Sequence, residues 1–573
     1  MSYTINPNAK NKWARNAENT MDLSLETDAS SVYLDNGRTL EQEIGEGSMI
    51  SNVATVDTAM SKVINGTLDG AYESGVMYGR SLVNNNNNKF KEIAFNATNT
   101  TQATNYALLL DNVAGCPDLN ITMVAGKKYL ILEKWTISST TGNGHTIQPK
   151  IIDKNGGVTY LSGNGQVKGI GTFTLKRTFT PTVDVDKFYF AITNGPGATV
   201  SGTFHYGMIM EYQEGMENWD IPFFTGLCDV KMPILRNTGK NLFDGNLEDG
   251  ALDSSGMPVE YENRKRTGFI KIKQGETYTI SGCTIARWCF YTPEKEFITT
   301  NTTQTTKPAP MDGYIRFSIQ TNFTHDNIQL EESSSATSDE DHKTNILHTP
   351  EIVTLRSLPN DVRDELNLKT GEYIKRIGEV VFDGDEDWVN IQTNMTENPF
   401  FELHKIYDAI PTSYGDKLRC NKILPTRGGG ISYANDAKGI SILGNKEVRI
   451  RTEESINGQT LAEFKQWLSQ NPVTVQYQLE TPIVTTIELL SVPFAYENGH
   501  IILESGFEGQ SLLPTLEYST VINKTGLIEN VAKTIQRQEK QLTKLEQMLI
   551  QNIINLDYNN TLLTLKNEME EML

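Results

Sequence analysis

The stretch Gly126-Lys-Lys-Tyr-Leu-Ile opens a series of four sequence blocks that occurs twice, in the same order. The first copy continues with Lys150-Ile-Ile-Asp-Lys-Asn-Gly-Gly, Asp186-Lys-Phe-Tyr-Phe-Ala-Ile-Thr-Asn and Met208-Ile-Met-Glu. The second copy consists of Gly275-Glu-Thr-Tyr-Thr-Ile, Trp288-Cys-Phe-Tyr-Thr-Pro-Glu-Lys-Glu-Phe, Asp312-Gly-Tyr-Ile-Arg-Phe-Ser-Ile-Gln-Thr-Asn and Ile328-Gln-Leu-Glu. Each block alternates apolar and polar residues as a half-buried strand does, and the second block of each copy contains a hairpin turn. Duplication of a small all-β unit predicts an array of binding or spacer modules rather than one enzyme core.

The third block of each copy separates its side chains into two faces. One face is apolar and carries Phe188, Phe190 and Ile192 in the first copy and Ile315, Phe317 and Ile319 in the second. The opposite face carries Lys187 and Tyr189, or Tyr314 and Arg316. One-sided alternation in strands joined by turns predicts two-sheet sandwiches of jelly-roll type.

The chain of 573 residues is long enough for three to five compact units. We predict a mainly β protein: tandem jelly-roll-like β-sandwiches with an N-terminal helical segment and a C-terminal coiled coil or helical bundle. The expected units are an attachment segment (1–37), a helical stalk (38–83), an Asn linker (84–88), β-sandwich 1 (89–225), β-sandwich 2 (226–350), a third β-rich domain (351–519) and the C-terminal coiled coil or helical hairpin (520–573). One helix, Leu461-Ala-Glu-Phe-Lys-Gln-Trp-Leu, is expected inside the third domain, which is itself open to interpretation as a diverged third copy.

Two stripes of apolar residues have heptad spacing and predict oligomerisation. The N-terminal stripe is Met49, Val53, Val56, Met60 and Val63; a single surface helix of a monomer is the alternative interpretation. The C-terminal stripe is Ile528, Val531, Ile535, Gln538, Leu542, Leu545 and Leu549. Since isolated helices of this length are marginal in water, heptad stripes at both ends of a β array favour a parallel homotrimer.

Composition excludes several classes of partner. The net charge of −20 argues against nucleic acid and anionic membranes, which the field of the protein would repel. Five cysteines without a CxxC pair favour neither a disulfide framework nor a zinc site. The absence of a signal peptide and of a long apolar run predicts synthesis in the cytoplasm without membrane insertion, with release by lysis as one route out.

Catalytic and cofactor motifs are missing from the sequence, which therefore predicts no enzyme, no metal and no cofactor. The densest carboxylate cluster is Asp383-Gly-Asp-Glu-Asp-Trp. Alternate carboxylates in a turn are typical of Ca²⁺ ligands, and paired acids serve glycosidases. A solvated acidic hairpin turn is the simpler interpretation, because the calcium-loop spacing is incomplete and adjacency in sequence does not create a cleft.

Sugar binding requires aromatic rings that stack on pyranosides, together with polar groups that fix the hydroxyls. The aromatic candidates are Trp135, Trp288, Trp388, Tyr189 and Tyr314, with Arg316 beside the last. Trp288 shares a strand face with Phe290, which favours a core position. Tyr189, Tyr314 and Arg316 lie opposite the apolar stripe and are the stronger candidates, although packing on a neighbouring subunit is an alternative.

Several phrases of the sequence resemble tail fibre or baseplate proteins of phages and prophages of Gram-positive bacteria. They are Gly239-Lys-Asn-Leu-Phe-Asp, Leu355-Arg-Ser-Leu-Pro-Asn-Asp-Val-Arg-Asp-Glu-Leu-Asn-Leu-Lys-Thr-Gly-Glu-Tyr, Arg376-Ile-Gly-Glu-Val-Val, Val475-Gln-Tyr-Gln-Leu-Glu-Thr-Pro-Ile and Tyr518-Ser-Thr-Val-Ile-Asn-Lys-Thr. The resemblance implies a homotrimeric virion component, attached to other tail proteins and presenting carbohydrate-binding-module-like sandwiches to host cell-wall polysaccharide. A purely structural tail connector and a polysaccharide depolymerase acting through Asp385 or Asp387 are the alternatives.

Overall fold

The computed structural model describes residues 4–5, 32–33, 54–63, 68–84, 93–98, 106–110, 123–141, 145–161, 169–194, 198–302, 305–322, 327–350, 352–391, 400–432, 438–451, 460–489, 492–509, 511–522, 543 and 547. The fold is mainly β, which confirms the predicted class. Near the N-terminus, β1 (Thr4–Ile5) pairs with β2 (Val32–Tyr33).

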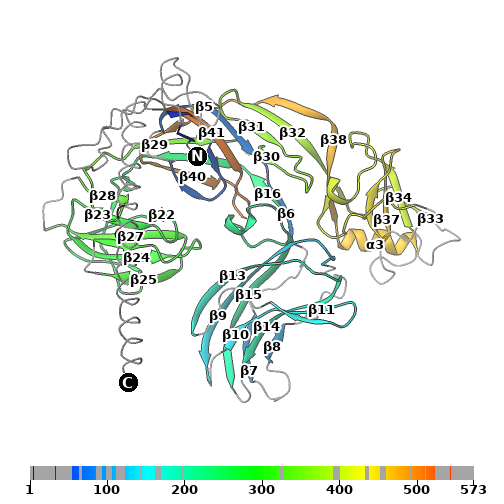
Figure 1. Ribbon diagram of the computed structural model, residues 1–573, viewed down its shortest axis with the longest axis horizontal. Coiled ribbons are helices and arrows are strands. Elements are labelled where there is room, and N and C mark those ends of the chain that lie inside the picture. The colour runs from blue at the N-terminus through cyan, green and yellow to red at the C-terminus, as the bar shows by residue number, and fades with distance from the viewer. Residues whose placement is uncertain are drawn as a thin grey trace, which may run out of the picture.

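A central β body collects strands from widely separated parts of the chain (Figure 1). One sheet has the order β3 (Ala54–Val56), β41 (Thr515–Ile522), β5 (Leu68–Tyr78), β31 (Glu365–Asn367), β32 (Glu372–Phe382), β38 (Val473–Thr486) and β35 (Leu418–Cys420), with β39 (Phe494–Ala495) also on β5. The second has the order β29 (Thr344–His348), β17 (Pro233–Thr238), β40 (His500–Ser505) and β4 (Met60–Lys62). The third has the order β30 (Thr354–Leu355), β16 (Gly226–Lys231) and β6 (Ser81–Asn84).

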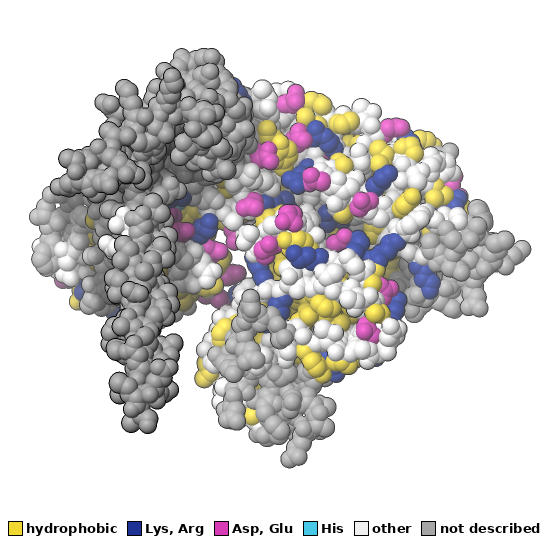
Figure 2. Space-filling model, viewed as in Figure 1, with side chains coloured by type: hydrophobic (Ala, Val, Ile, Leu, Met, Phe, Trp, Pro, Cys, Tyr) yellow, Lys and Arg dark blue, Asp and Glu magenta, His cyan; other side chains and the backbone are white. Residues whose placement is uncertain are grey.

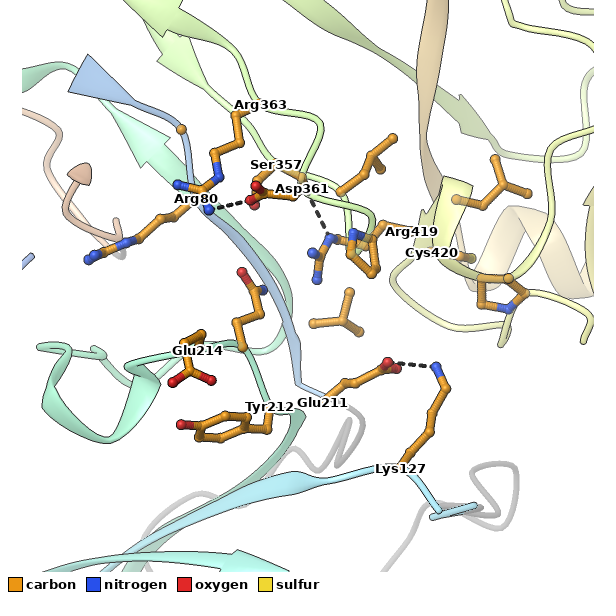
Figure 3. Close-up of a pocket in the computed structure, with 18 of the residues that line it drawn as sticks. Arg80, Lys127, Glu211, Tyr212, Glu214, Ser357, Asp361, Arg363, Arg419 and Cys420 are labelled. Atoms are coloured by element: carbon orange, nitrogen blue, oxygen red, sulfur yellow. Dashed lines mark hydrogen bonds and ion pairs between the residues drawn. The ribbon is translucent and has the colours of Figure 1, made fainter. Parts of the chain in front are cut away.

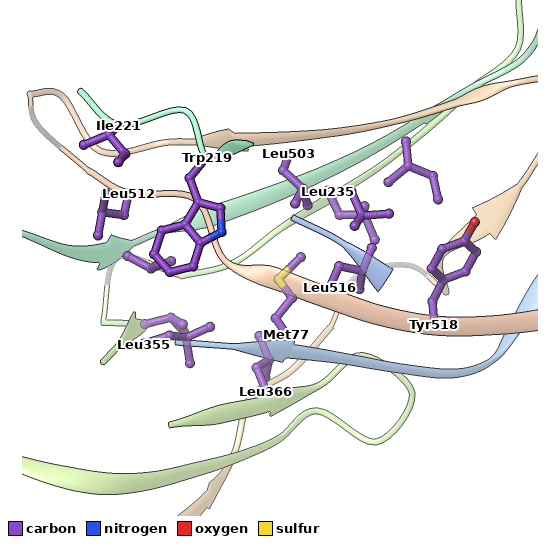
Figure 4. Close-up of a cluster of buried hydrophobic side chains, with 14 of the residues drawn as sticks. Met77, Trp219, Ile221, Leu235, Leu355, Leu366, Leu503, Leu512, Leu516 and Tyr518 are labelled. Carbon is purple, nitrogen blue, oxygen red and sulfur yellow. The ribbon is translucent and has the colours of Figure 1, made fainter. Parts of the chain in front are cut away.

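The core of the central body is formed by residues that are distant in sequence. Figure 4 shows Met77, Leu235, Leu366 and Leu516 from four strands meeting in one cluster. The short 3₁₀ helix η3 (Met216–Asn218) and the segment after it bring Trp219 into the same cluster. On the face drawn in Figure 2, basic and acidic side chains are interspersed over the surface, so the negative net charge is not gathered there into one patch.

Three modules are inserted into this body, and each one replaces the turn of an antiparallel strand pair. Sandwich 1 lies between β6 and β16, which pair up to Asn84 and Gly226. Sandwich 2 lies between β17 and β29, which end on the pair Thr238 and Thr344. The third module lies between β32 and β38. The last residue pair of these strands before the insertion is Phe382 and Val473. Since paired Cα atoms are about 5 Å apart, each module begins and ends at one point of the body.

Sandwich 1 is built from two facing sheets around the buried side chains of Trp135, Phe190 and Phe204. One sheet has the order β13 (Gly171–Phe179), β9 (Tyr129–Thr140), β15 (Thr199–Glu211) and β7 (Ile93–Thr98). The other has β10 (His145–Ile147), β14 (Val185–Asn194), β11 (Lys150–Asp153) and β12 (Val158–Tyr160), with β8 (Tyr106–Leu110) on β14.

Sandwich 2 has a corresponding pair of sheets around Trp288, Phe317 and Tyr278. One sheet has the order β18 (Leu247–Asp249), β21 (Arg264–Thr267), β27 (Gly313–Gln320), β24 (Ile285–Tyr291) and β25 (Phe297–Asn301), with β22 (Ile270–Ile272) on β27. The other has β26 (Thr306–Pro308), β23 (Thr277–Ser281) and β28 (Gln329–Glu332), and a hairpin of β19 (Ala251–Leu252) and β20 (Pro258–Val259) is added.

The duplicated sequence blocks occupy equivalent places in the two sandwiches. The first and fourth blocks pair with each other as β9 with β15 and β23 with β28, while the second and third pair as β11 with β14 and β24 with β27. Even single hydrogen bonds recur: the hydroxyl of Tyr129 accepts from the backbone N–H of Val124, and that of Tyr278 accepts from Lys273. The repeat is therefore a repeat of structure as well as of sequence.

The third module packs a small sheet and a helix around Trp388, Phe401 and Phe464. Its sheet has the order β33 (Val389–Ile391), β34 (Phe400–Lys405), β37 (Glu447–Arg451) and β36 (Gly439–Ile442), and a 3₁₀ turn η4 (Gly415–Lys417) precedes β35. Helix α3 (Leu461–Gln470) confirms the predicted inserted helix. It begins with a capping box in which Thr460 and Glu463 exchange hydrogen bonds.

The prediction of a helical stalk over residues 38–83 is wrong in its described part. Strands β3, β4, β5 and β6 occupy this region, and Val56, Met60 and Val63 are buried. Their spacing of 4 and 3 fits a helix, but pairing of β3 with β41 and of β4 with β40 provides the burial instead. Asn84 is likewise no linker residue: it ends β6, is fully buried, and donates to the carbonyl oxygen of Phe224. The predicted tandem order is corrected to three insertions in one body.

The topology predicts which internal deletion the fold tolerates. Replacing residues 240–342 with Asn-Gly reconnects β17 and β29 through a two-residue hairpin turn. We expect the shortened chain to remain folded and to unfold cooperatively in urea, as followed by circular dichroism. The matched control deletes 226–350, the unit that the sequence alone suggests; because this removes β16, β17 and β29, it should abolish folding. Equal loss of structure in both chains would contradict the hairpin-insertion topology.

A buried carboxylate in the central body makes stability depend on pH. Asp364 is fully buried and accepts hydrogen bonds from the backbone N–H groups of Arg356, Arg376 and Ile377. Burial outweighs these bonds and raises the pKa of Asp364 from 3.8 to about 6. Between these values the folded state keeps a proton that the unfolded chain has lost, so stability falls as pH rises.

We therefore expect Asp364 to lower the free energy of unfolding by about 1.4 kcal/mol between pH 5 and pH 7. Urea titrations at several pH values measure this slope in the wild type and in Asp364→Asn. The variant loses one hydrogen bond and with it some stability. The part of the pH dependence of the free energy of unfolding that comes from Asp364 should be absent in it. An unchanged slope in the variant would mean that Asp364 does not titrate in this range.

Candidate functional site

The outer face of sandwich 2 brings together the predicted residues Tyr314 and Arg316. Both lie on β27, two residues apart, and point away from the core that holds Ile315 and Phe317. Around them, Phe269, Tyr291 and Phe297 form with Tyr314 a connected set of rings. We call these four residues the aromatic platform.

The rings of the platform meet edge to face. The centroid of Phe269 lies 5.0 Å from that of Tyr291 and 5.7 Å from that of Tyr314. The rings of Tyr291 and Phe297 are 6.1 Å apart. Phe269 and Phe297 are 36% and 37% exposed, whereas Tyr291 is buried and holds its place by donating to the carbonyl oxygen of Gly256 at 2.6 Å. The platform is thus a fixed surface with two rings open to solvent.

Two cations flank the exposed ring of Phe269. Lys295 Nζ lies 5.1 Å from the centroid of Phe269 and 5.7 Å from that of Tyr314. The guanidinium of Arg316 lies 4.7 Å from the Phe269 centroid. All three distances are within the range of cation–π attraction. The same geometry leaves Lys295, which is exposed, able to donate hydrogen bonds to a ligand on the ring.

Arg316 is buried and positions the platform from below. Its Nε donates to the carbonyl oxygen of Thr267 at 2.9 Å, and its Nη2 lies 3.6 Å from the carboxylate of Glu248. Burial raises the pKa of the Tyr314 hydroxyl above its usual range, so this group stays protonated and can both donate and accept. Exposed apolar rings beside hydroxyl, ammonium and carboxylate groups provide the chemistry that binds pyranosides.

The loop that carries Lys295 also contacts sandwich 1. Lys295 has a positive φ of 65° in the turn between β24 and β25. On either side of it, the carboxylates of Glu294 and Glu296 lie 3.6 and 3.9 Å from Nζ of Lys134 on β9. The loop therefore lies between the two sandwiches.

Tyr189 lies on sandwich 1 and takes no part in the platform. It is half-buried on the outer side of β14, and Lys150 Nζ lies 5.8 Å from its ring centroid. Its position relative to β14 resembles that of Tyr314 on β27, but the first sandwich has no equivalent of Phe269 among the described ring contacts.

The structure contradicts a surface role for Trp135 and Trp388, which were predicted as glycan-binding residues. Trp135 is fully buried against Phe204, with 4.4 Å between ring centroids. Trp388 is 3% exposed and packs on Phe464. Each indole N–H donates to a glutamate two positions earlier, Glu133 and Glu386 respectively, so both tryptophans are satisfied core residues. Trp288 is also a core residue, as its position beside Phe290 predicts.

The predicted oligomerisation residues divide into two groups. Val56 and Val63 belong to the core of the central body, and Met60 packs into sandwich 2, so none of them forms a helical seam. The other nine positions lie outside the described residues: Met49, Val53, Ile528, Val531, Ile535, Gln538, Leu542, Leu545 and Leu549.

The acidic turn at residues 383–387 uses two of its carboxylates internally: Asp383 accepts from the backbone N–H of Asp385, and Glu386 accepts several hydrogen bonds. Glu386 accepts hydrogen bonds from the backbone N–H groups of Asp383 and Gly384 as well as from the Trp388 indole. Asp383, Asp385 and Asp387 are exposed. Within the described ranges, no group of three or more His, Cys, Asp or Glu residues is arranged to hold a metal ion. A search of the same residues finds no helix long and apolar enough to cross a bilayer.

Sequence reasoning missed Phe269, Phe297 and Lys295. Phe269 precedes the short strand β22, where alternation cannot be followed, and Lys295 belongs to a turn. Phe297, however, stands directly after the recognised Pro-Glu-Lys turn and pairs with Tyr291 across the hairpin. Counting positions across that turn would have placed Phe297 on the face of Tyr314.

Comparison with known proteins gives no match: neither a family model, nor a curated protein, nor a solved structure is similar to this chain. The candidate site therefore rests on its own residues and contacts.

Proposed function

We propose that this chain is a non-enzymatic, homotrimeric tail fibre or baseplate protein of a phage, which binds host cell-wall polysaccharide through the aromatic platform of sandwich 2. The observation that carries the proposal is the partly exposed ring of Phe269, flanked by Tyr314, Lys295 and Arg316 on a rigid sheet. The phrases of the sequence that resemble phage tail proteins support the assignment to a virion.

The polysaccharide is held by stacking and avidity in this proposal. One platform binds sugar weakly. Its rings and hydroxyls only replace contacts that the sugar already makes with water, so the net gain in free energy is small. Three chains joined by the C-terminal heptads present three platforms to a repetitive polymer. The second contact is then effectively intramolecular, which raises the residence time far beyond that of one site.

A structural connector is the competing proposal, and one observation favours it. On the C-terminal part of β38, which pairs with β32, Ile483 and Val484 are 49% and 57% exposed. Exposed apolar residues on a paired strand suit a protein partner. In that case the sandwiches contact other tail proteins and no sugar.

The platform is tested with purified Gram-positive cell-wall polysaccharide and the full-length protein. We expect Phe269→Ala to weaken binding at least tenfold, because the variant removes one of the two exposed rings of the platform together with its cation contacts. The matched control is Tyr160→Ala, which removes a 44% exposed ring from sandwich 1 and should bind as the wild type does. Circular dichroism verifies that both variants are folded. Wild-type affinity in Phe269→Ala would overturn the platform, and capture of tail proteins without polysaccharide would favour the connector.

The trimer is tested by removing residues 523–573, just beyond the end of β41. Light scattering after size exclusion should give three chains for the full-length protein and one for the truncated protein. Because the platforms remain intact, binding to a single oligosaccharide should be unchanged, while adsorption to whole cells should fall by about 10²-fold or more with the loss of avidity. A full-length protein that is monomeric would contradict the trimer.

A further inference from the structure

A cleft of about 440 Å³ opens where sandwich 1, the central body and the third module meet (Figure 3). Lys127 and Glu211 line it from sandwich 1, Ser357 from the central body, Arg419 from the edge strand β35 of the large central sheet, and Arg427 from the third module. Its volume falls in the range of small-molecule sites. The cleft is separate from the aromatic platform, none of whose residues line it.

Arg419 is a buried cation in this cleft without a counter-ion. It lies on β35 and is 7% exposed. Its Nε donates to the carbonyl oxygen of Ser357 at 3.2 Å, but its Nη2 has no hydrogen-bond partner among the described residues. Within the part of the chain that the structure describes, Arg419 forms no ion pair, and the carboxylates of Asp229 and Glu211 act on it only at longer range. Figure 3 shows the guanidinium extending toward the middle of the cleft.

Three other buried arginines of the chain are each paired with a carboxylate. Arg177 has Glu133, Arg449 has Glu402 at 2.6 Å, and Arg316 has Glu248. Arg80, which also lines the cleft, donates to the carbonyl oxygens of Asp57 and Leu513 and lies 3.8 Å from the Trp219 ring centroid. An uncompensated buried charge costs several kcal/mol, so the position of Arg419 is one that an anion would complete.

The charged side chains that line the cleft sum to a small positive charge, because Arg80, Lys127, Arg363, Arg419 and Arg427 outnumber Glu211, Glu214 and Asp361. The carboxylate of Glu211 lies 2.6 Å from Nζ of Lys127, and Asp361 pairs with Arg363. Arg427 is exposed at the rim. Burial lowers the pKa of Arg419 to about 10, which still leaves it charged at neutral pH. The whole chain has a net charge of −20, so the positive charge of the cleft comes from these side chains alone.

We propose that this cleft binds a small organic oxyanion whose phosphate or carboxylate group pairs with Arg419. A planar guanidinium can donate two parallel hydrogen bonds to either group. The body of the ligand lies against the apolar part of the lining, which includes Leu358, Pro359, Leu424 and Pro425. Because three parts of the chain contribute to the lining, the bound ligand also ties them together.

Isothermal titration calorimetry on the full-length protein tests the site with two probes, glucose 6-phosphate and glucuronate, at matched ionic strength. We expect saturable binding of at least one probe, accompanied by a rise in the unfolding temperature. Arg419→Gln keeps a hydrogen-bonding side chain but removes the charge, and should weaken binding at least tenfold. Arg427→Gln, at the exposed rim, should weaken it a few-fold without affecting the fold. Arg236→Gln, which lies outside the cleft, is the matched control and should bind as the wild type does.

The outcomes assign the ligand or reject the site. Binding of glucose 6-phosphate alone identifies a phosphate site, and binding of glucuronate alone identifies a carboxylate site. If the wild type binds neither probe at 10 mM, or if Arg419→Gln binds with wild-type affinity, the proposed site is rejected. None of these variants changes a residue of the aromatic platform. The cleft and the platform are therefore tested independently, and failure of one proposal does not decide the other.

Discussion

The buried carboxylate of Asp229 is the constraint on which the central body depends. Asp229 lies on β16 and is 4% exposed, and burial raises its pKa. Ser81 on β6 and Gln476 on β38 donate to its oxygens, and Nε of Arg356 lies 3.3 Å away. Gln476 and Arg356 also bind Glu379 on β32. The strand pair that closes sandwich 1 is thereby locked to the pair that closes the third module, because an unpaired charge at this depth would cost several kcal/mol.

Local sequence patterns predicted the modules better than the body that carries them. Alternating apolar residues and turn residues indicate strands that pair with a neighbour in the sequence, as β24 does with β25. The duplicated blocks therefore correspond to strands of the structure. The body is closed by pairs such as β3 with β41, whose partners are more than 400 residues apart and leave no local signal. Val56, Met60 and Val63 show the consequence: a helical spacing was overridden by pairing with strands from the other end of the chain.

Residues of the candidate site could be predicted where the alternation of a strand showed which face a side chain occupies. Residue type alone did not predict them. Tyr314 and Arg316 were found because they alternate with a clear apolar stripe. Trp135 and Trp388 were chosen as aromatic residues, and both are core residues bound to a glutamate at position i−2. The pattern Glu-x-Trp occurs at both sites, and in each case it places the indole N–H on a carboxylate inside the protein. Phe269 and Arg419 act through tertiary contacts that no single segment encodes.

The hairpin insertions explain how the aromatic platform, the proposed binding surface, is attached rigidly to the central body. A domain on a single linker rotates freely, and binding must then pay the entropy of fixing its orientation. Sandwich 2 is instead joined to the body by two adjacent strands, and the loop carrying Lys295 contacts sandwich 1 through Lys134. Avidity requires platforms held at a spacing that the polymer can match. Two strands at the base and an ion-paired loop at the side supply that rigidity within each chain.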